Sequence, residues 1–389
     1  MTRKKVLFIS HEASRSGAPI VLLHFLKWFK ANTDIPFLIL LKIGGELESD
    51  FEDLAPVIVL SRVKPGLVER VSYRLRLHKF KRLDHFRKLK KKLSQENIGL
   101  IYSNTVTNGE VLEFLSSLKC PVITHIHELE YTINCCGGIE NFKQVQHYTQ
   151  HYIAVAKAVK DNLVKHQKIE ASTIDVIHEF IPTQVPIKNS QPQVFYPILE
   201  ELNIPQEALV VGASGTMSWR KGADLFVQLA RAVNQRQLNT PVHFVWVGGE
   251  NNGIYFNELI HDVRHAGLEQ YVHFTGVQPN PLDYFRVFNV FTLLSREDPF
   301  PLVLLEAASI GKPIVCFDNS GGAPEFVEDD CGFVVPYLDI EAMADKVVAL
   351  MKSVDLRQSL GERAAKKAWH RHDVTVLAPK ILNLIERFI

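Results

Sequence analysis

The stretch VFTLLSREDPFPLVLLEAASIGKPIVCF, residues 290–317, shows most clearly how this chain is built. It begins and ends with short apolar runs, Val290–Leu294 and Pro313–Phe317, and a helix-like segment around Glu306 joins them. Short continuous apolar runs are typical of parallel strands, because helices cover both faces of such a sheet. The stretch therefore predicts a strand–helix–strand unit.

The same alternation runs through nearly the whole chain and predicts a doubly wound α/β fold. Further strands are expected at residues 6–10, 37–41, 57–60, 100–103, 122–125, 152–155, 209–213, 242–247 and 272–274. Five prolines between Pro182 and Pro205 interrupt this rhythm and indicate a linker. We expect two domains, residues 1–185 and 186–373, whose strand ends offer loops to a cleft between them.

Composition excludes several classes of protein. Of the 389 residues 46% are hydrophobic and 22% are charged, which excludes a disordered, collagen-like or coiled-coil chain. No apolar run approaches the ~18 residues of a membrane-spanning helix, and the run after Lys5 is too short for the core of a signal peptide. The five cysteines include no C-x-x-C pair, which suits reduced thiols. A cytoplasmic location is therefore expected.

The net charge of +1 conceals a strongly basic segment. Arg62–Lys92 contains thirteen Lys and Arg residues against Glu69 and Asp84, and its apolar residues approximate a helical spacing. Basic amphipathic segments of this kind bind the anionic inner face of a membrane, but a solvated helix packed on the first domain accounts for the pattern equally well. Because the rest of the chain is acidic, a nucleic-acid partner is disfavoured.

Two glycine-containing turns follow the first strands of the two halves. In SRSGAP, residues 14–19, Gly17 would let backbone amides approach an anion at a helix N-terminus. In GTMSWRKGADLF, residues 215–226, Arg220 and Lys221 stand beside a helix start and would clamp a diphosphate without a metal. Neither stretch has the spacing of a dinucleotide or Walker loop, so an ordinary tight turn and a solvated basic turn remain the alternatives.

Two acids and a histidine follow other strands. Glu306 lies eight residues after Asp298 in an apolar run, where its carboxylate needs donors such as the vicinal hydroxyls of a ribose or hexose. An exposed position on a helix is the alternative. His127 would lie just beyond a strand end, where doubly wound domains place functional residues. His147 and His151 have the spacing of one helix face, which leaves a metal site open as well.

Together these motifs resemble the retaining glycosyltransferases of family 4, which use nucleotide sugars. The family signature has two acids with seven residues between them, as Asp298 and Glu306 have here, although Asp298 stands where glutamate is usual. The resemblance implies the GT-B fold, in which two Rossmann-like doubly wound domains face each other across a deep cleft. It also implies that the final helix, residues 374–389, crosses back onto the first domain.

The diphosphate stretch of the family, G-R-L-x-x-x-K-G, is matched in part. Gly215 and Lys221 occupy family positions, Thr216 stands at the usual arginine, and Arg220 supplies a cation one residue before Lys221. The segments WRKG and REDPFPLV resemble a variant branch in which these departures are paired.

Other segments extend the resemblance over nearly the whole chain. SGGAPEFVEDDCGFVVP, residues 320–336, resembles the GG-x-PE stretch of the family, and VHFTGV resembles its base-contacting loop, which includes Val277. In the first half the matching residues are the loop glycine Gly17, the acceptor-facing Asn104 with Thr105, and the pair His127 and Glu128.

The resemblance implies retaining transfer of a hexosyl group to an acceptor hydroxyl of a glycan, glycolipid or lipid-linked saccharide. The implied roles are orientation of the donor sugar by His127, stabilisation of the leaving diphosphate by Arg220 and Lys221, and contacts with sugar or ribose by Asp298, Phe300, Pro301, Leu302 and Glu306. Beyond the nucleotide sugar, no cofactor and no essential metal are expected. The alternatives are a non-catalytic nucleotide-sugar-binding module and another enzyme of this fold, such as a sugar-nucleotide epimerase.

Overall fold

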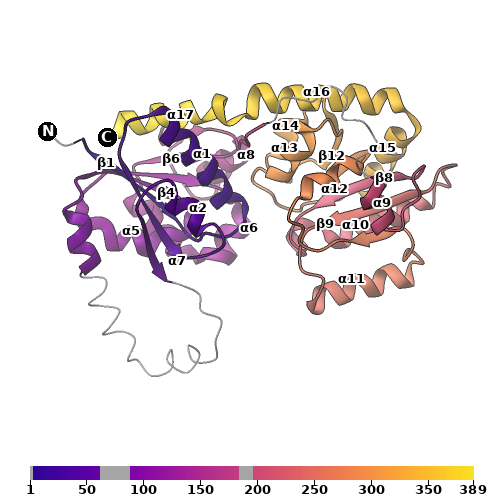
Figure 1. Cartoon of the computed structure of the whole chain (residues 1–389), viewed down its shortest axis with the longest axis horizontal. Coiled ribbons are helices and arrows are strands. Elements are labelled where there is room, and N and C mark those ends of the chain that lie inside the picture. The colour runs from indigo at the N-terminus through magenta and orange to yellow at the C-terminus, as the bar shows by residue number, and fades with distance from the viewer. Residues whose placement is uncertain (1–2, 62–87, 184–195) are drawn as a thin grey trace. The chain divides into compact units, whose positions relative to one another are not determined.

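The computed structural model describes residues 3–61, 88–183 and 196–389. They form two compact units (Figure 1). Of the described residues, the first unit contains those from 3 to 155, 159–177 and 377–389, except the undescribed stretch 62–87, and the second contains 156–158 and those from 178 to 376, except 184–195. The sequence placed the junction at residue 185, whereas the contacts divide the chain after Ile177.

The first unit is built on a parallel sheet in the strand order β3-β2-β1-β4-β5-β6-β7. Because β1 pairs with both β2 and β4, the order reverses beside it. The strands are β1 (Lys5–Ser10), β2 (Phe37–Ile43), β3 (Val57–Ser61), β4 (Ile98–Asn104), β5 (Val122–Ile126), β6 (His151–Ala154) and β7 (Ile174–Val176).

Aromatic packing joins this sheet to the helix that follows β1. Phe8 of β1 meets Phe25 and Phe29 of α1 with ring centroids 5.9 and 5.5 Å apart, and all three side chains are buried. Such aromatic contacts contribute to the core beyond the area that they bury. The helices assigned to this part of the chain are α1 (Gly17–Asn32), α2 (Glu48–Glu52), α5 (Gly109–Leu115), α6 (Glu130–Thr132), α7 (Gly138–Tyr148), α8 (Lys157–Lys165) and α17 (Val374–Phe388).

The second unit repeats the design with the strand order β10-β9-β8-β11-β12-β13, again all parallel. Phe226 of α10 packs on Phe244 and Trp246 of β9, and all three belong to the hydrophobic core. The strands are β8 (Leu209–Ser214), β9 (Val242–Val247), β10 (Val272–Phe274), β11 (Val290–Leu293), β12 (Ile314–Phe317) and β13 (Gly332–Val335). The helices are α9 (Tyr196–Glu201), α10 (Ala223–Asn234), α11 (Gly253–His265), α12 (Pro281–Val287), α13 (Leu302–Ser309), α14 (Ala323–Val327), α15 (Ile340–Lys352) and α16 (Val354–His372).

The two strand orders determine where ligands can bind. In each sheet the order reverses between the first strand and its neighbour, β1 and β4 in one unit and β8 and β11 in the other. Loops that follow these strands diverge to opposite faces and leave a crevice at the carboxyl edge of the sheet. Residues after these four strands are therefore the first candidates for function.

The doubly wound fold and every strand expected from the sequence are confirmed, with ends that shift by at most two residues. Among the described residues, the sequence missed the edge strands β7 and β13. Both are short; β7 carries Asp175, and β13 begins at Gly332. The final helix, α17, is confirmed, and its residues from Leu377 onward belong to the first unit.

Two further expectations concern the first unit. His147 and His151 do not share a helix face, because α7 ends at Tyr148 and His151 begins β6, which pairs with β5. The expected helix in Arg62–Lys92 lies largely outside the described residues, of which only 88–94 are helical here. No helix in the described ranges combines the length and apolar character that spanning a membrane requires.

Candidate functional site

The loop after β8 places two cations at the start of α10. Gly215 directly follows the strand, its amide donates to Val247 O at 3.0 Å, and the exposed Thr216 comes next. A single 3₁₀ turn, Trp219–Lys221, then leads to Gly222 with φ of 77°. A Cβ at Gly222 would collide with the carbonyl oxygen of Leu294, so this loop packs directly against the end of β11.

Lys221 meets an acid from the loop after β11. Its Nζ lies 2.5 Å from Asp298 Oδ2, and Ser295 Oγ donates to the same oxygen at 3.2 Å. Both charged side chains are largely buried, and burial lowers the pKa of Lys221, with Arg220 acting in the same direction and Asp298 opposing it. The structure thus brings together two residues that the sequence predicted in separate motifs. The sequence predicted that Asp298 contacts sugar hydroxyls, and in the structure its carboxylate forms an ion pair with Lys221.

Arg220 lies beside this pair and contacts the same loop. Its Nη1 donates to Glu297 O at 2.7 Å, and its own carbonyl accepts from the Arg296 amide at 2.8 Å. The backbone of Asp298 is fixed from the other side, since its amide donates to Ser320 O at 2.7 Å. Hydrogen bonds therefore join the loop after β8, which carries both cations, to the loop after β11.

Helix α13 begins next to these charges. Pro301 caps it and Leu302 is its first residue, so its first amides have no intrahelical acceptor. Phe300 is buried, its ring packed 5.2 Å from that of His372. The side chains of the predicted sugar-contacting residues 300–302 therefore build the core, and only their backbone is available to a ligand.

Glu306 lies one turn further along α13. Burial raises the pKa of its carboxyl to about 7. Within the part of the chain that the structure describes, no group donates a hydrogen bond to this half-buried carboxylate. A half-buried acid normally has partners, so its position suits a ligand that brings hydroxyl donors.

The loop that carries Val277 lies at the same edge of the sheet. It follows β10, and Gly276 O accepts from the Gly248 amide after β9 at 2.8 Å. The Val277 side chain is 74% exposed, so the structure assigns it no core role. An exposed loop residue at a strand end matches the position expected for a base contact.

In the first unit one asparagine joins three loops. Asn104 ends β4 and is fully buried; its Nδ2 donates to Ala18 O at 2.9 Å, next to Gly17 at the start of α1. Its Oδ1 lies 2.7 Å from Nε2 of His127, which follows β5. Because the amide oxygen can only accept, Nε2 carries the proton in this arrangement. The predicted Gly17, Asn104 and His127 thus meet at one sheet edge.

Glu128 and neighbouring polar groups complete this edge. The Glu128 carboxylate accepts from the amides of His127 at 2.9 Å and Val106 at 3.3 Å, so it fixes the loop. Three buried atoms here have no hydrogen-bond partner among the described residues: His11 Nδ1, Asn108 Oδ1 and His125 Nε2. The sequence missed these residues, since only the topology brings their loops together.

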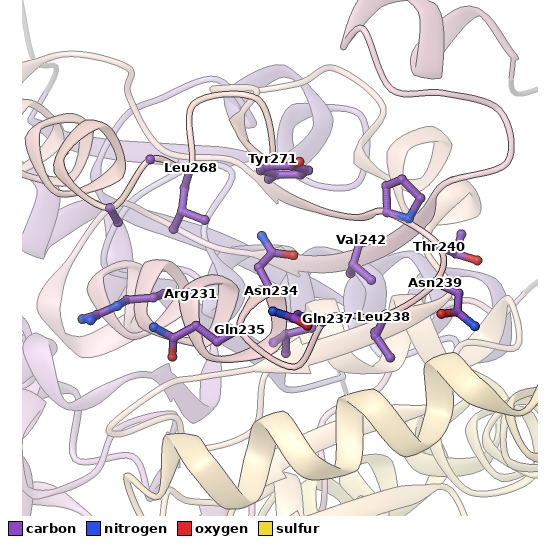
Figure 2. Close-up of a pocket in the computed structure, with 14 residues that line it drawn as sticks. Arg231, Asn234, Gln235, Gln237, Leu238, Asn239, Thr240, Val242, Leu268 and Tyr271 are labelled. Carbon is purple, nitrogen blue, oxygen red and sulfur yellow. The ribbon is translucent and has the colours of Figure 1, made fainter.

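Two cavities lie elsewhere. A cavity of about 470 Å³ in the second unit is lined by polar side chains such as Asn234, Gln235 and Thr240 (Figure 2), and it lies where β9 begins, at the sheet edge opposite to Lys221. A second, of about 370 Å³, lies where β5 begins, near Pro121 and Val122. The second cavity is lined in part by His147, which the sequence left open as a metal ligand, but neither cavity is lined by a residue predicted to bind the donor or acceptor.

No group of three His, Cys, Asp or Glu residues in ranges 3–61, 88–183 and 196–389 is arranged to hold a metal ion. His151, one of the residues considered for such a site, instead lies 3.0 Å from Asp175.

Two family models match the chain. Glycosyl transferases group 1 matches residues 197–367, and Glycosyltransferase Family 4 matches residues 44–185, so together they span most of it. N-acetyl-alpha-D-glucosaminyl L-malate synthase of Bacillus anthracis is 22% identical over 286 residues, 71% of each chain. N,N'-diacetylbacillosaminyl-diphospho-undecaprenol alpha-1,3-N-acetylgalactosaminyltransferase of Campylobacter jejuni is 24% identical over 213 residues, 55% of this chain and 52% of that protein.

Solved structures agree over the whole length. Anabaena Alr3699/HepE, in complex with UDP and glucose, superposes with a TM-score of 0.80 at 20% identity and covers 99% of this chain and 100% of its own. Sucrose-phosphate synthase from Thermosynechococcus elongatus gives 0.75 at 17% identity, with 99% of both chains covered. At these identities the likeness shows the fold, which is GT-B.

Proposed function

This chain belongs to the family 4 glycosyltransferases, and we propose that it transfers a hexosyl group from a nucleotide diphosphate sugar to an acceptor hydroxyl with retention of configuration. The observation that carries the proposal is the position of Arg220 and Lys221 at the start of α10, together with the Glu306 carboxylate of α13, to which no group among the described residues donates a hydrogen bond. Arg220, which bonds here to a backbone oxygen beside the Lys221–Asp298 pair, provides positive charge for a diphosphate, and Glu306 provides an acceptor for ribose hydroxyls.

The second unit would stabilise the leaving group. Negative charge develops on the nucleoside diphosphate as the glycosidic bond breaks, and preorganised cations and helix-terminal amides stabilise it best where water is excluded. Arg220 and Lys221 are held by two loops and need little reorganisation to do this. We propose that they replace a metal ion, so that no essential metal is needed.

The donor and its sugar would be held by residues already on the sheet edges. Glu306 would accept from the ribose, the loop of Val277 would contact the base, and the backbone at 300–302 would contact the sugar. UDP-sugars are the first donors to test, because Anabaena Alr3699/HepE is described in complex with UDP and UDP-glucose.

The first unit would supply His127 and the acceptor contacts. With Nε2 bonded to Asn104, His127 is held as an orienting group for the sugar and is a poor candidate for a strong base. A double displacement would need a carboxylate nucleophile with a second acid, and no such pair stands out in the sequence, so we propose a front-face route assisted by the leaving phosphate.

The acceptor class follows from the relatives only as a proposal. The relatives include an N-acetyl-alpha-D-glucosaminyl L-malate synthase and an N-acetylgalactosaminyltransferase that is named for a diphospho-undecaprenol-linked sugar. We propose a glycan, glycolipid or lipid-linked saccharide, and small anionic acceptors belong in the same panel.

Product analysis tests this proposal. Incubation with UDP-glucose or UDP-N-acetylglucosamine and the acceptor panel should give a product whose anomeric proton coupling shows the α configuration of the donor. A β-linked product would contradict retention. Conversion of the donor to its epimer would favour an epimerase, and tight UDP binding without turnover over all donors and acceptors would favour a binding module, as the substitutions at Thr216 and Asp298 allow.

A further inference from the structure

The two unusual motifs of the second unit are joined by one arginine. Arg296 lies in the loop after β11, two residues before Asp298, and it faces the loop after β8 that contains Arg220 and Lys221. The sequence showed only that both loops depart from the family pattern. The structure shows a physical connection between the departures.

Arg296 holds the backbone of the cationic loop at two consecutive residues. Its amide donates to Arg220 O at 2.8 Å, and its Nη1 donates to Trp219 O at 2.6 Å. The guanidinium carbon also lies 4.8 Å from the centroid of the Trp219 ring, within the range of a cation–π contact. These contacts fix the turn from which both cations project.

The same guanidinium neutralises an acid at the start of α10. Nη1 and Nη2 bind the two carboxylate oxygens of Asp224 at 2.9 and 2.7 Å, and Tyr255 donates to Asp224 Oδ1 at 3.1 Å. The Arg296 side chain is only 10% exposed. A two-point arginine–carboxylate pair of this kind specifies geometry that a lysine cannot reproduce.

Arg296 is itself held in place by its own loop. Tyr337 donates to Arg296 O at 3.1 Å, and Asp298 is fixed through Ser320. The arginine is therefore a rigid connection between the loop that carries Asp298 and the loop that carries Lys221. Its loss would leave the Asp224 charge close to where the donor diphosphate would bind.

We propose that Arg296 is a positioning residue for the diphosphate site: it sets the Trp219–Lys221 turn and neutralises Asp224, and it does not touch the donor. This inference rests on the proposed function, because it assigns the diphosphate to Arg220 and Lys221. Of the contacts that Arg296 makes with WRKG, the one that depends on the identity of the partner side chain is that of its guanidinium with the Trp219 ring.

The test measures UDP affinity by calorimetry, kcat and KM for the donor, and thermal unfolding, for Arg296→Gln, Asp224→Asn and the double variant. Arg296→Gln should bind UDP more weakly and lose about 100-fold in kcat, since a displacement of about 1 Å in a catalytic group costs that much. The double variant restores the charge balance but not the hydrogen bond to Trp219 O. We expect it to regain thermal stability while UDP affinity stays low.

Arg236→Gln is the matched control. Arg236 pairs with Glu341 and Asp345 in the same unit, and this variant should lower thermal stability without changing UDP affinity. Arg296→Lys should recover less than half of the lost affinity, because lysine cannot make the two-point contact. Wild-type UDP affinity in Arg296→Gln, or its full return in the double variant, would overturn the positioning role. If the wild type itself neither binds UDP nor turns over a donor, it is the proposed function that fails.

Discussion

The carboxyl group of Glu306 is the most informative single group in the second unit. It lies in an apolar helix, burial raises its pKa to about 7, and ribose hydroxyls would need its ionised form as acceptor. Donor binding should therefore strengthen as pH rises from 6 to 8. In Glu306→Gln, which cannot ionise, this pH dependence should vanish. Calorimetric titration of UDP at several pH values checks this, and an unchanged pH profile in the variant would show that another group is responsible.

The same shift predicts how Glu306 affects folding. The pKa in the folded chain lies above the usual 4.5, so the folded state binds more protons than the unfolded state between pH 4.5 and 7. Stability should fall as pH rises through this window, by roughly 2–3 kcal/mol for this group. Urea unfolding of the wild type and Glu306→Gln across the window measures this contribution as the difference in their slopes. If the free energy of unfolding changes equally with pH in both proteins, the Glu306 carboxyl is well solvated in the folded state.

Lys221 should be needed for both stability and turnover. Its replacement by Met leaves Asp298 buried without its cation, which should cost about 3–5 kcal/mol, and removes a donor to the leaving group, which should lower kcat by about 10²–10³. Lys312→Met is the control, because Lys312 is also buried but bonds to Arg286 O and Phe288 O away from the site. It should lower thermal stability and leave kcat unchanged. Equal kcat losses in the two variants would show that Lys221 does not stabilise the leaving group.

At the scale of an element, the turn between β8 and α10 depends on Gly222. Gly222 and Gly267 have similar φ values, 77° and 67°, but only at Gly222 would a Cβ collide with a backbone carbonyl. Gly267→Ala should cost about 1–2 kcal/mol for the left-handed conformation, and Gly222→Ala should cost clearly more. Urea unfolding measures both losses of stability. Equal losses would mean that the loop after β11 moves to make room for the new Cβ at little cost.

Elements were predictable from the sequence where burial leaves a pattern. Interior strands such as Val242–Val247 are apolar except for His243, so their existence and ends could be read directly. The edge strand Ile174–Val176 has neighbours on one side only and tolerates Asp175, so it carries no such signal. Likewise, His151 was expected on a helix because spacing alone does not reveal where a strand pairing begins.

The site divides in the same way. The motifs containing Lys221 and Asp298 were visible because each follows an apolar strand and resembles a stretch of the family, and the strand order then placed both at one edge. The roles of Arg296 and Asn104 could not be read from the sequence, because each depends on carbonyl oxygens of another loop. Hydrogen bonds to backbone leave no trace in the identity of the partner residue.

For the whole molecule, the account predicts activity without a divalent metal. Two cations and the start of α13 would supply the charge that a metal provides in other transferases. Nucleotide release from the preferred donor should therefore be unchanged by EDTA and by added Mg²⁺ or Mn²⁺. A rate that disappears with EDTA and returns with one of these ions would contradict this part of the mechanism.

The central claim is that the second unit binds a nucleotide sugar through Glu306 and releases the nucleotide. The most direct measurement is nucleotide release from UDP-, GDP-, ADP- and dTDP-sugars by the wild type and Glu306→Ala, both checked for equal thermal stability. The account predicts release from at least one donor by the wild type and its loss in the variant. Release that is equal in both proteins, or a wild type that neither releases nor binds any of these nucleotides, would contradict it.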